Sequence, residues 1–377
     1  MSRLCIDLPP LAPDYSGAAS ALFDLGGIVV MHDASGCTGN YTSYDEPRWL
    51  GSRSAVFCSG LRRMDAVMGN DDKYINKTIA AAKDLSPTVI AYLGSPVPMV
   101  IGTDLKGMAA ETEYSTGIPS FGFNTTGQRF YDRGASDVFT ALIKRFTKER
   151  SKECTLGKRV NILGLLPIDF GSKGNCEMIC EHIVSLGYEI VSRFAVGLTV
   201  EQVEDCSDAD LSIVVSRSGL AAAKLLHKLY GIPYICGVPI KGADGFEKKL
   251  NREYVSVGCP YSDGGILIIH EQIFANSLRD MIHQSIDISV TVGSMFGLEK
   301  ELALPYDKEL PDESEVRREV NSGRYSVIIA DPMVKKLIKN ENVRFIGLPH
   351  PAVSSKLHWD EVPDYLSDDI KNIISCL

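Results

Sequence analysis

The chain has 377 residues and a mass of 41.2 kDa, which is enough for two or three domains with sizeable cores. Hydrophobic residues make up 45% and charged residues 23%, which excludes disordered, collagen-like and fibrous proteins. The net charge of -9, the lack of a lysine or arginine block and the lack of a membrane-spanning apolar run argue against nucleic acid or a membrane as the main partner.

Residues 1–155 are predicted to form a first α/β unit. Short apolar runs indicate strands, and longer amphipathic runs indicate helices. The expected elements are, in order, strand, helix, strand and helix, at 27–31, 73–85, 88–93 and 134–148. A polar stretch at 148–158 then links this unit to the next one.

Residues 156–262 are predicted to form a second unit in which strands and helices alternate. Thr199 is the expected N-cap of one of its helices. Alternation of this kind implies a parallel sheet with right-handed crossovers. The expected elements lie at 159–166, 176–186, 188–191, 200–205, 210–216 and 219–230.

Residues 263–377 repeat this pattern and are predicted to form a third unit. Stretches 201–215 and 315–329 share an order of helix, polar turn and buried strand, so we expect two structurally similar domains. The expected elements lie at 265–270, 271–284, 287–292, 313–322 and 325–330. The predicted fold class is therefore α/β, with three Rossmann-like domains built on parallel sheets.

The chain contains ten cysteines and no signal-peptide pattern, so we expect a cytoplasmic protein without a disulfide scaffold. Cys37 lies in a glycine turn after a buried strand, which is the usual ligand position in open α/β sheets. Cys58 follows in the segment Ala55-Val-Phe-Cys58-Ser-Gly60. Their separation fits neither a zinc knuckle nor a CxxC redox pair. From spacing alone, such cysteines are more often small buried apolar residues.

Several segments of the chain, read in order, resemble the nitrogenase component 1 family. Residues 27–48, with His32, Gly36, Cys37, Tyr41 and Arg48, resemble the P-cluster loop of that family. The other similar segments are 64–73, 89–105 and 122–127, followed by Gly231-Ile-Pro-Tyr and Gly347-Leu-Pro-His, which resemble the strand entries of its second and third domains. The resemblance covers nearly the whole chain and implies the three-domain architecture of nitrogenase component 1.

The resemblance implies an iron-sulfur cluster bound by Cys37 and Cys58. A [4Fe–4S] cluster needs four protein ligands, so two copies of the chain in a homodimer would complete the set. Gly36 and Ser95 belong to the same expected cofactor site. His32 either orients the cluster loop or donates a hydrogen bond to a cluster sulfur, or it is a strand-end histidine bonded to backbone.

Two departures from the family pattern argue against a true nitrogenase. Pro96 stands where nitrogenase subunits have a third cluster cysteine, which argues against a full eight-iron cluster. Val215 stands where the molybdenum-iron cofactor cysteine precedes an Arg-Ser pair, here Arg217-Ser218. Because valine binds no metal, reduction of dinitrogen on that cofactor is not expected.

The resulting hypothesis is a nitrogenase-like reductase component. The chain has neither a phosphate-binding loop nor a GxGxxG motif, so the resemblance implies that a separate ATP-dependent iron protein supplies electrons. The substrate, a small molecule or a metallocofactor, is expected in the cleft between domains near Arg217, Ser218 and His350. No catalytic acid or base is identified.

Three alternatives remain open. The chain is also consistent with a metal-cluster assembly scaffold or carrier of the same family, and with a substrate-binding protein that holds no metal. A sister chain in a heterodimer would supply a different ligand set.

Each candidate residue also has an ordinary structural interpretation. Arg48 either balances cluster charge or forms a surface ion pair, Ser218 is a possible helix cap, and His350 a turn residue. His270-Glu271 is read as a helix start with an acidic residue that the helix dipole favours. Cys176 and Cys180, four residues apart on one helix face, are predicted core residues. No role is assigned to Cys5, Cys154, Cys206, Cys236, Cys259 and Cys376.

Overall fold

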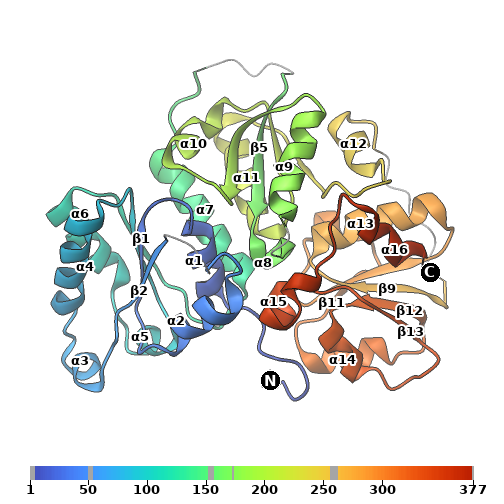
Figure 1. The fold of residues 1–377 in the computed structure, drawn as a ribbon, viewed down its shortest axis with the longest axis horizontal. Helices are drawn as coiled ribbons and strands as arrows, with labels where there is room; N and C mark the ends of the chain where they lie inside the picture. Colours follow the sequence, from blue (N-terminus) through green and yellow to red (C-terminus); the bar gives the residue numbers. More distant parts are fainter. Residues whose placement is uncertain (1–4, 50–53, 152–156, 172–173, 255–261, 376–377) are drawn as a thin grey trace.

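The computed structural model describes residues 5–49, 54–151, 157–171, 174–254 and 262–375. Three sheets, all of them parallel, follow one another along the chain. They occupy the left, the top centre and the right of the molecule in Figure 1. The predicted α/β class with several parallel sheets is confirmed.

The first sheet has four strands in the order β2-β1-β3-β4. Its two central strands, β1 (Ile28–Met31) and β3 (Ile90–Leu93), are buried throughout and lie beside the edge strands β2 (Ala55–Cys58) and β4 (Ser120–Phe123). The helices of this unit are α1 (Asp14–Leu22), α2 (Gly36–Asn40), the π-helix η1 (Tyr41–Asp45), α3 (Arg63–Met68), α4 (Asp72–Leu85), α5 (Pro96–Val100), α6 (Leu105–Thr116) and α7 (Tyr131–Phe146).

The second sheet has the order β6-β5-β7-β8, which is the same crossover pattern as the first. Its strands are β5 (Arg159–Leu165), β6 (Glu189–Ala195), β7 (Leu211–Val214) and β8 (Tyr234–Cys236). Its helices are α8 (Pro167–Phe170), α9 (Asn175–Ser185), α10 (Val200–Asp205), η2 (Cys206–Asp208), α11 (Arg217–Tyr230) and α12 (Gly245–Leu250).

The third sheet has five strands in the order β11-β10-β9-β12-β13. They are β9 (Gly265–Ile269), β10 (Val290–Ser294), β11 (Lys308–Glu309), β12 (Tyr325–Ala330) and β13 (Arg344–Gly347). The helices of this unit are α13 (Gln272–Ser285), η3 (Lys300–Leu302), α14 (Glu313–Val320), η4 (Pro332–Leu337), α15 (Pro351–Ser354), η5 (Ser355–Leu357), η6 (Trp359–Glu361) and α16 (Asp368–Ser375).

The sequence-based elements agree with this structure except at particular positions. Thr199 is the N-cap of α10, as predicted, and accepts a hydrogen bond from the backbone of Gln202. The prediction that Ser218 caps α11 is wrong, because Ser216 occupies the N-cap position. The prediction that Gly347 begins a strand is also wrong, because β13 ends there.

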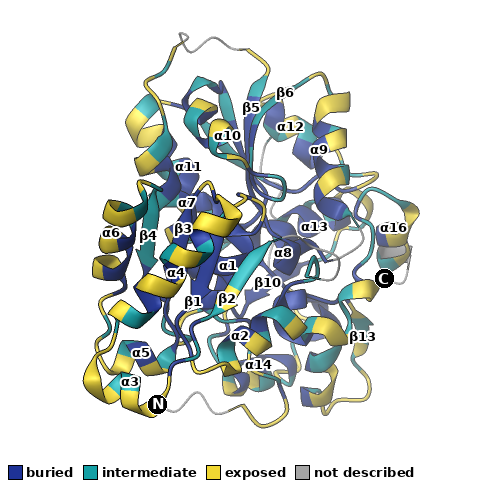
Figure 2. Cartoon of the chain, turned by 60° about the vertical axis from the view of Figure 1, so that its left-hand side comes forward, coloured by how far each residue is buried: buried dark blue, intermediate teal, exposed yellow. Residues whose placement is uncertain are grey.

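Helix α1 was not predicted, and its burial explains why. All nine of its residues are buried, so it lacks the polar face that marks an amphipathic helix. It packs against α7 at two glycines: a Cβ at Gly17 would lie 1.9 Å from the Tyr131 carbonyl oxygen, and one at Gly134 would lie 1.8 Å from that of Asp14. These glycines bring the two helix backbones into contact in the interior (Figure 2).

Each predicted domain range contains one sheet, but the terminal segments cross between units. The backbone N–H groups of Ile6, Asp7 and Leu8 donate to one carboxylate oxygen of Glu313 in the third unit, at 2.7, 2.9 and 3.0 Å. Near the other end, the Tyr365 N–H donates to the side chain of Asn175 in the second unit at 3.0 Å.

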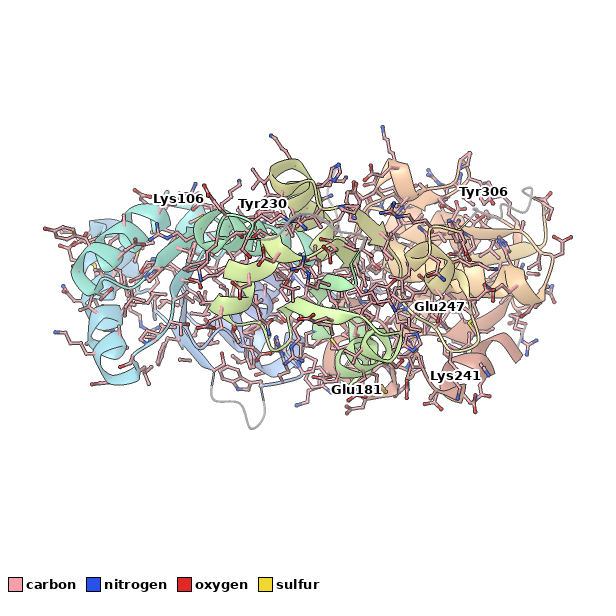
Figure 3. The ribbon with its side chains drawn as sticks, turned by 90° about the horizontal axis from the view of Figure 1, so that it is seen from above. Lys106, Glu181, Tyr230, Lys241, Glu247 and Tyr306 are labelled. Atoms are coloured by element: carbon pink, nitrogen blue, oxygen red, sulfur yellow. The ribbon has the colours of Figure 1, made fainter. Side chains whose placement is uncertain are left out.

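Seen from above, the molecule is elongated, with Lys106 of the first unit toward one end and Tyr306 of the third toward the other (Figure 3). Among the described residues, no helix combines the length and apolarity that a membrane crossing requires.

Candidate functional site

Each sheet has one point where the strand order reverses direction, and ligands of open α/β sheets bind outside the carboxyl ends of the strands at this point. It falls between β1 and β3, between β5 and β7, and between β9 and β12. The first carries the predicted cysteine site. The second and third meet at the centre of the molecule.

The two predicted cluster cysteines lie at the carboxyl edge of the first sheet. Cys58 is the last residue of β2 and is paired in register with Met31, the last residue of β1. Cys37 is the second residue of α2, which begins after the loop that leaves β1. Both side chains are half-buried, and both thiols are free.

Asp33 connects the two cysteine-bearing segments. Its carboxylate accepts hydrogen bonds from the backbone N–H groups of Ser35 at 3.0 Å and Thr38 at 3.1 Å, which shapes the turn before Cys37. Its backbone carbonyl accepts a hydrogen bond from the Cys58 thiol at 3.5 Å. One residue therefore fixes the position of both cysteines relative to the strand end.

The environment of Cys37 acts on its thiol in two directions. Burial raises the pKa of the Cys37 thiol, and the nearby Asp33 carboxylate and Cys58 raise it further. Hydrogen bonding to Tyr15 and Ser95 favours the thiolate and lowers the pKa. The Ser95 hydroxyl also donates to the His32 carbonyl at 3.0 Å, so it links the ends of β1 and β3.

His32 lies beside this edge but makes no hydrogen bond through its ring. It is 1% exposed and packs edge-on against Tyr74, with 4.9 Å between ring centroids. Neither ring nitrogen has a partner among the described residues, so the interpretation of a backbone-bonded histidine is wrong. Burial lowers the pKa of His32, which keeps the ring neutral.

The two other predicted residues of the loop differ in role. Gly36 begins α2 next to Cys37, and a Cβ there would meet no atom within 4 Å, so space does not require a glycine. Arg48 forms ion pairs with Glu46 at 2.8 Å and Asp24 at 3.0 Å and stacks on Phe23 at 4.3 Å. The ion-pair interpretation of Arg48 is confirmed, although the pair with Glu46 is largely buried rather than on the surface.

The donor chemistry of this edge fits half of an iron-sulfur site. Within the described ranges, no group of three or more His, Cys, Asp or Glu residues is placed to hold a metal ion. Two half-buried thiols at one sheet edge can supply two of the four thiolates that a [4Fe–4S] cluster needs. By contrast Cys176 and Cys180 on α9 are buried at 4% and 7% exposure, as predicted for core residues.

Exposed apolar side chains occur on helices that follow two strands of the cysteine-bearing sheet. They lie on α3, which follows the Cys58 loop, and on and just after α5, which follows Ser95. Helices α2, α3 and α5 lie together at the foot of the first unit in both Figure 1 and Figure 2. This apolar patch consists of Met64 (66% exposed), Val67 (72%), Met68 (72%), Val97 (51%), Val100 (86%) and Ile101 (48%).

The second and third sheets meet at a buried polar junction to which all three units contribute. Tyr131 of the first unit donates a hydrogen bond to Asp169 of the second. His350 of the third unit lies 3.5 Å from the Tyr131 hydroxyl and 3.8 Å from Asp169, measured from its Nε2 atom. The His270 ring lies 4.6 Å from the His350 ring.

Arg217 binds these units together. Its guanidinium contacts Asp132 of the first unit at 3.4 Å and Glu299 of the third at 3.3 Å, and donates to the Phe296 and Gly297 carbonyls. Its backbone N–H donates to Glu271 at 3.0 Å. The Arg217 side chain is 2% exposed and so connects the units from inside the core.

Several buried polar atoms of the junction have no partner in the described part of the chain. Such atoms are rare in folded proteins and point to a missing water or ligand. They are Asp132 Oδ1, Asp169 Oδ2, Arg217 Nε, Ser218 Oγ and both ring nitrogens of His270.

Burial also sets the charge of the junction. It raises the pKa of the Asp169 carboxyl well above its usual value, and the neighbouring Glu271 raises it further. It lowers the pKa of His270 to about 3 and that of His350 well below its usual value. Burial therefore favours the uncharged forms of the acid and of both imidazoles at the junction.

The structure brings the predicted Arg217, Ser218 and His350 to this junction. His350 also caps α15, where its Nδ1 atom accepts from the Ala352 N–H at 3.1 Å. Glu271 caps α13 and accepts from the Phe274 N–H, as predicted for a helix-start acid. Sequence reasoning missed Tyr131, Asp132 and Asp169. For Asp169, the signal was an acid two residues after Pro167, directly behind a buried strand.

Of the cysteines without an assigned role, Cys154, Cys259 and Cys376 lie outside the described residues. Cys206 is buried, and burial raises its pKa to about 12.

These features define an α/β protein of three parallel-sheet units. Two half-buried thiols lie at the carboxyl edge of the first sheet, and a buried polar junction lies at the strand-order reversals of the other two. Residues 13–252 match the model of the family described as nitrogenase component 1 type oxidoreductase. The chain belongs to this family.

Two curated relatives illustrate the range of the family. The chain is 26% identical over 236 residues to a protein of Methanosarcina barkeri named nitrogenase iron-molybdenum cofactor biosynthesis protein NifE, a match that covers 59% of this chain and 50% of the relative. It is 22% identical over 187 residues to one of the subunits of light-independent protochlorophyllide reductase from Angiopteris evecta, a match that covers 48% of this chain and 37% of the relative. The chain thus spans about half or less of these relatives.

The fold itself matches a solved nitrogenase structure named "Nitrogenase Cp1 at pH 6.5". The TM-score is 0.73 at 14% sequence identity, and the match covers 100% of this chain and 94% of that chain. At this identity the match supports the fold alone.

Proposed function

We propose that the chain is a nitrogenase-like reductase component that forms a homodimer around an iron-sulfur cluster and reduces a substrate at the buried junction. The observation that carries this proposal is the pair of half-buried thiols, Cys37 and Cys58, at the reversal point of the first sheet. Two thiols per chain match half of the four ligands of a [4Fe–4S] cluster.

The surroundings of the cysteines support a partner of the same kind. The exposed residues of the apolar patch lie on and just after the helices that follow the Cys58 loop and Ser95, namely α3 and α5. An exposed apolar patch of this kind marks an interface. A two-fold axis at the cysteine edge would bury both patches and bring four thiols together.

The residues at this edge have distinct tasks in the proposal. Cys37 and Cys58 hold the cluster, Asp33 fixes their spacing, and Tyr15 and Ser95 stabilise the Cys37 thiolate by hydrogen bonding. A cluster bound there supplies one-electron transfer. The ring nitrogens of His32 have no partner among the described residues, so the ring could donate a hydrogen bond to a cluster sulfur.

The polar junction is the proposed substrate site. Its unpartnered atoms, which include Asp169 Oδ2 and Arg217 Nε, need hydrogen-bond partners that the described residues do not supply. Burial raises the pKa of Asp169, which lies next to Tyr131 and His350, so Asp169 is the proposed proton donor to a bound molecule. The substrate is either a small molecule or a metallocofactor.

An ATP-dependent iron protein is the proposed electron donor, as is usual for nitrogenase component 1 proteins. This partner is carried over from the family and not from a surface of the chain.

The alternative function is a cluster-assembly scaffold or carrier. The likeness to a protein named for iron-molybdenum cofactor biosynthesis favours it. In that case the cargo would bind at the same junction, but no product would be released by reduction.

Iron analysis of anaerobically purified protein tests the cysteine site. We expect about four iron and four sulfide per dimer and an electron paramagnetic resonance signal after reduction. A colourless protein with both thiols free to alkylation would contradict the proposal.

The native mass and one substitution test the dimer. We expect a dimer in solution, and Val100→Asp should convert it to a monomer that loses its iron. The matched control is Tyr114→Asp, because Tyr114 is 92% exposed on α6, outside the apolar patch. A dimer that persists in Val100→Asp would place the interface elsewhere.

Electron transfer separates the reductase from the scaffold. In the reductase, an iron protein with ATP should reduce the bound cluster repeatedly, and a small-molecule acceptor should reoxidise it. In the scaffold, iron or a preformed metal cluster should instead pass from this protein to an acceptor protein. Loss of both activities would contradict both functions.

A further inference from the structure

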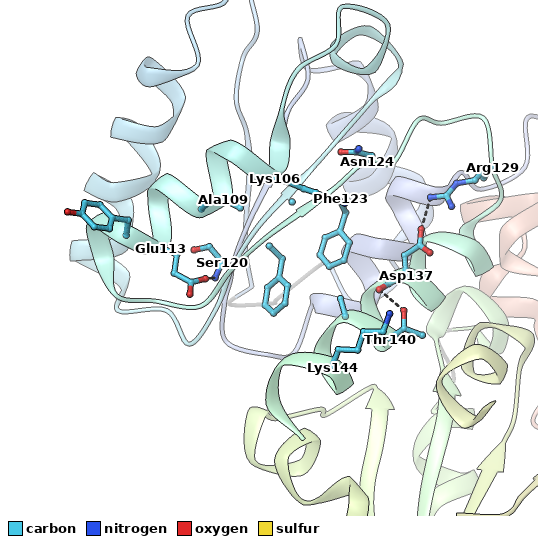
Figure 4. Close-up of a pocket in the computed structure, with 15 residues that line it drawn as sticks. Lys106, Ala109, Glu113, Ser120, Phe123, Asn124, Arg129, Asp137, Thr140 and Lys144 are labelled. Carbon is cyan, nitrogen blue, oxygen red and sulfur yellow. Dashed lines mark hydrogen bonds and ion pairs between the residues drawn. The ribbon is translucent and has the colours of Figure 1, made fainter. Parts of the chain in front are cut away.

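A further cavity lies along the outer edge of the first sheet, beside the edge strand β4. It is an open groove of about 850 Å³ between α6 and α7, with the edge strand β4 as its floor (Figure 4). Neither its position nor its residues serve the proposed redox function.

The floor of the groove offers unpaired strand backbone and apolar surface. Phe121 and Phe123 lie on the same side of β4, stacked with 5.9 Å between their centroids, and Phe121 is half-buried. In the parallel pairing, Phe121 and Phe123 bond to β3, so the peptide groups of Gly122 point outward. Alanines 109, 110 and 141 line the helix walls, so the walls leave room above the strand.

The acidic groups of the groove are already neutralised. Glu113 pairs with Arg145 at 2.7 Å and accepts from the Ser120 N–H at 2.9 Å, which closes that end of the strand. Asp137 pairs with Arg129 at 2.7 Å.

The lysines of the groove, in contrast, are available. Lys106 on α6 and Lys144 on α7 are exposed, and neither forms an ion pair with any described residue. In Figure 4 they lie on opposite walls, with the phenylalanines between them. The groove is thus positively charged on a chain whose net charge is -9.

Lysine at a sheet edge also serves to prevent aggregation. A sheet edge that only has to avoid aggregation needs neither an apolar floor nor a groove wide enough to hold another segment. The phenylalanine floor and the cavity therefore favour a binding role.

We propose that this groove binds an extended acidic peptide segment of a partner protein, which adds a fifth strand beside β4. Main-chain hydrogen bonds to the Gly122 region would give affinity, and Phe121 would contact apolar side chains on its own face. Lys106 and Lys144, on opposite walls, would pair with acidic side chains on the two faces of the added strand. This inference is independent of the proposed redox function.

Fluorescence anisotropy with fluorescein-labelled octapeptides tests the proposal on the full chain. The peptides carry glutamate on both faces of the strand, together with valine or phenylalanine. We expect saturable binding that weakens about tenfold in the double variant Lys106→Glu/Lys144→Glu, since two exposed charge pairs are reversed. Lys83→Glu, on α4 and equally exposed, is the matched control and should bind as the unchanged chain does.

Strand addition is tested separately from charge. A peptide of the same sequence with alternate backbone amides N-methylated keeps its charge but loses the donors of a β-ladder, so we expect no saturable binding. Four results would each overturn the proposal. They are equal binding of the two peptides, full competition by a straight-chain dicarboxylate, unchanged affinity in the lysine variant, and no saturable binding of any of these peptides.

Discussion

The cysteine edge and the polar junction occupy equivalent positions in similar sheets, yet they differ in nearly every physical respect. At the cysteine edge, Cys37 and Cys58 are half-buried, and exposed apolar side chains lie on and just after the helices α3 and α5. At the junction, Asp169, Arg217 and His350 are buried between three units. The same reversal of strand order therefore lies beside half-buried cysteines in one place and beside buried polar groups in the other.

The difference shows which groups each site is missing: cluster ligands at the cysteine edge, and hydrogen-bond partners at the junction. In the proposed cluster site, the cysteine edge supplies two of four ligands, and a second chain would supply the other two. The junction has its groups from one chain and lacks hydrogen-bond partners, which only a bound molecule or water can supply. Substitutions at the first should therefore affect metal content, and substitutions at the second should affect stability.

The largest expected effect is on metal content at the cysteine edge. In Cys58→Ser, the dimer would lose two of four thiolates, so its iron should fall from about four per dimer to almost none. Cys5→Ser is the control, because Cys5 is exposed and lies in the N-terminal segment. Measurement of iron and sulfide checks this prediction. A full iron content in Cys58→Ser would show that Cys58 does not bind the cluster.

At the junction, Arg217→Met should lower the free energy of unfolding by about 3–5 kcal/mol, because it leaves buried acids without their cation. Denaturant unfolding measures this change. Lys224→Met is the matched control: Lys224 also pairs with Glu299, but it is 41% exposed, so we expect a loss of about 1 kcal/mol or less. Equal losses in the two variants would mean that Arg217 is not the cation on which the junction depends.

Acid should reveal the neutral histidines of the junction. The pKa of His270 is about 3 in the folded chain against an ordinary 6.5, because burial disfavours its charged form. Below pH 6.5 the unfolded chain therefore binds a proton that the folded chain does not, and His270 costs about 1.4 kcal/mol of stability for each pH unit.

His270→Gln removes this cost, so its stability relative to the unchanged chain should improve steadily from about pH 6.5 to about pH 4.5. Unfolding midpoints at several pH values measure the trend, and His32→Gln serves as the comparison from the other site. An unchanged difference across this range would show that His270 is already charged in the folded chain.

The smallest effect is expected for Ser95→Ala at the cysteine edge. It removes one hydrogen bond to the His32 carbonyl, which is worth about 1 kcal/mol, and a hydrogen bond that favours the Cys37 thiolate. The pKa of Cys37 should rise, so alkylation of metal-free protein should need a higher pH. Tyr15→Phe should act in the same direction. A lower pKa in either variant would contradict the assigned contacts.

Sequence patterns were sufficient to predict the helices and strands that have a clear apolar period or typical flanking residues. Alternation of buried strands and amphipathic helices predicted the parallel sheets, and β12 (Tyr325–Ala330) and α10 (Val200–Asp205) have the predicted bounds. Helix α1 gave no such pattern, because a helix buried on every side has no polar face. The edge strands β2 and β4 were also missed. They are as short as β1 and β3 but are only partly buried.

The sequence alone singled out Cys37 and Cys58, since a glycine turn after a buried strand and the order of the surrounding segments are local properties. It also indicated Arg217, Ser218 and His350 by resemblance. Only the tertiary structure joined these three to Tyr131, Asp132 and Asp169, because their contacts connect units that lie far apart in the chain. Burial, charge state and unpartnered atoms depend on those long-range contacts, and no local pattern encodes them.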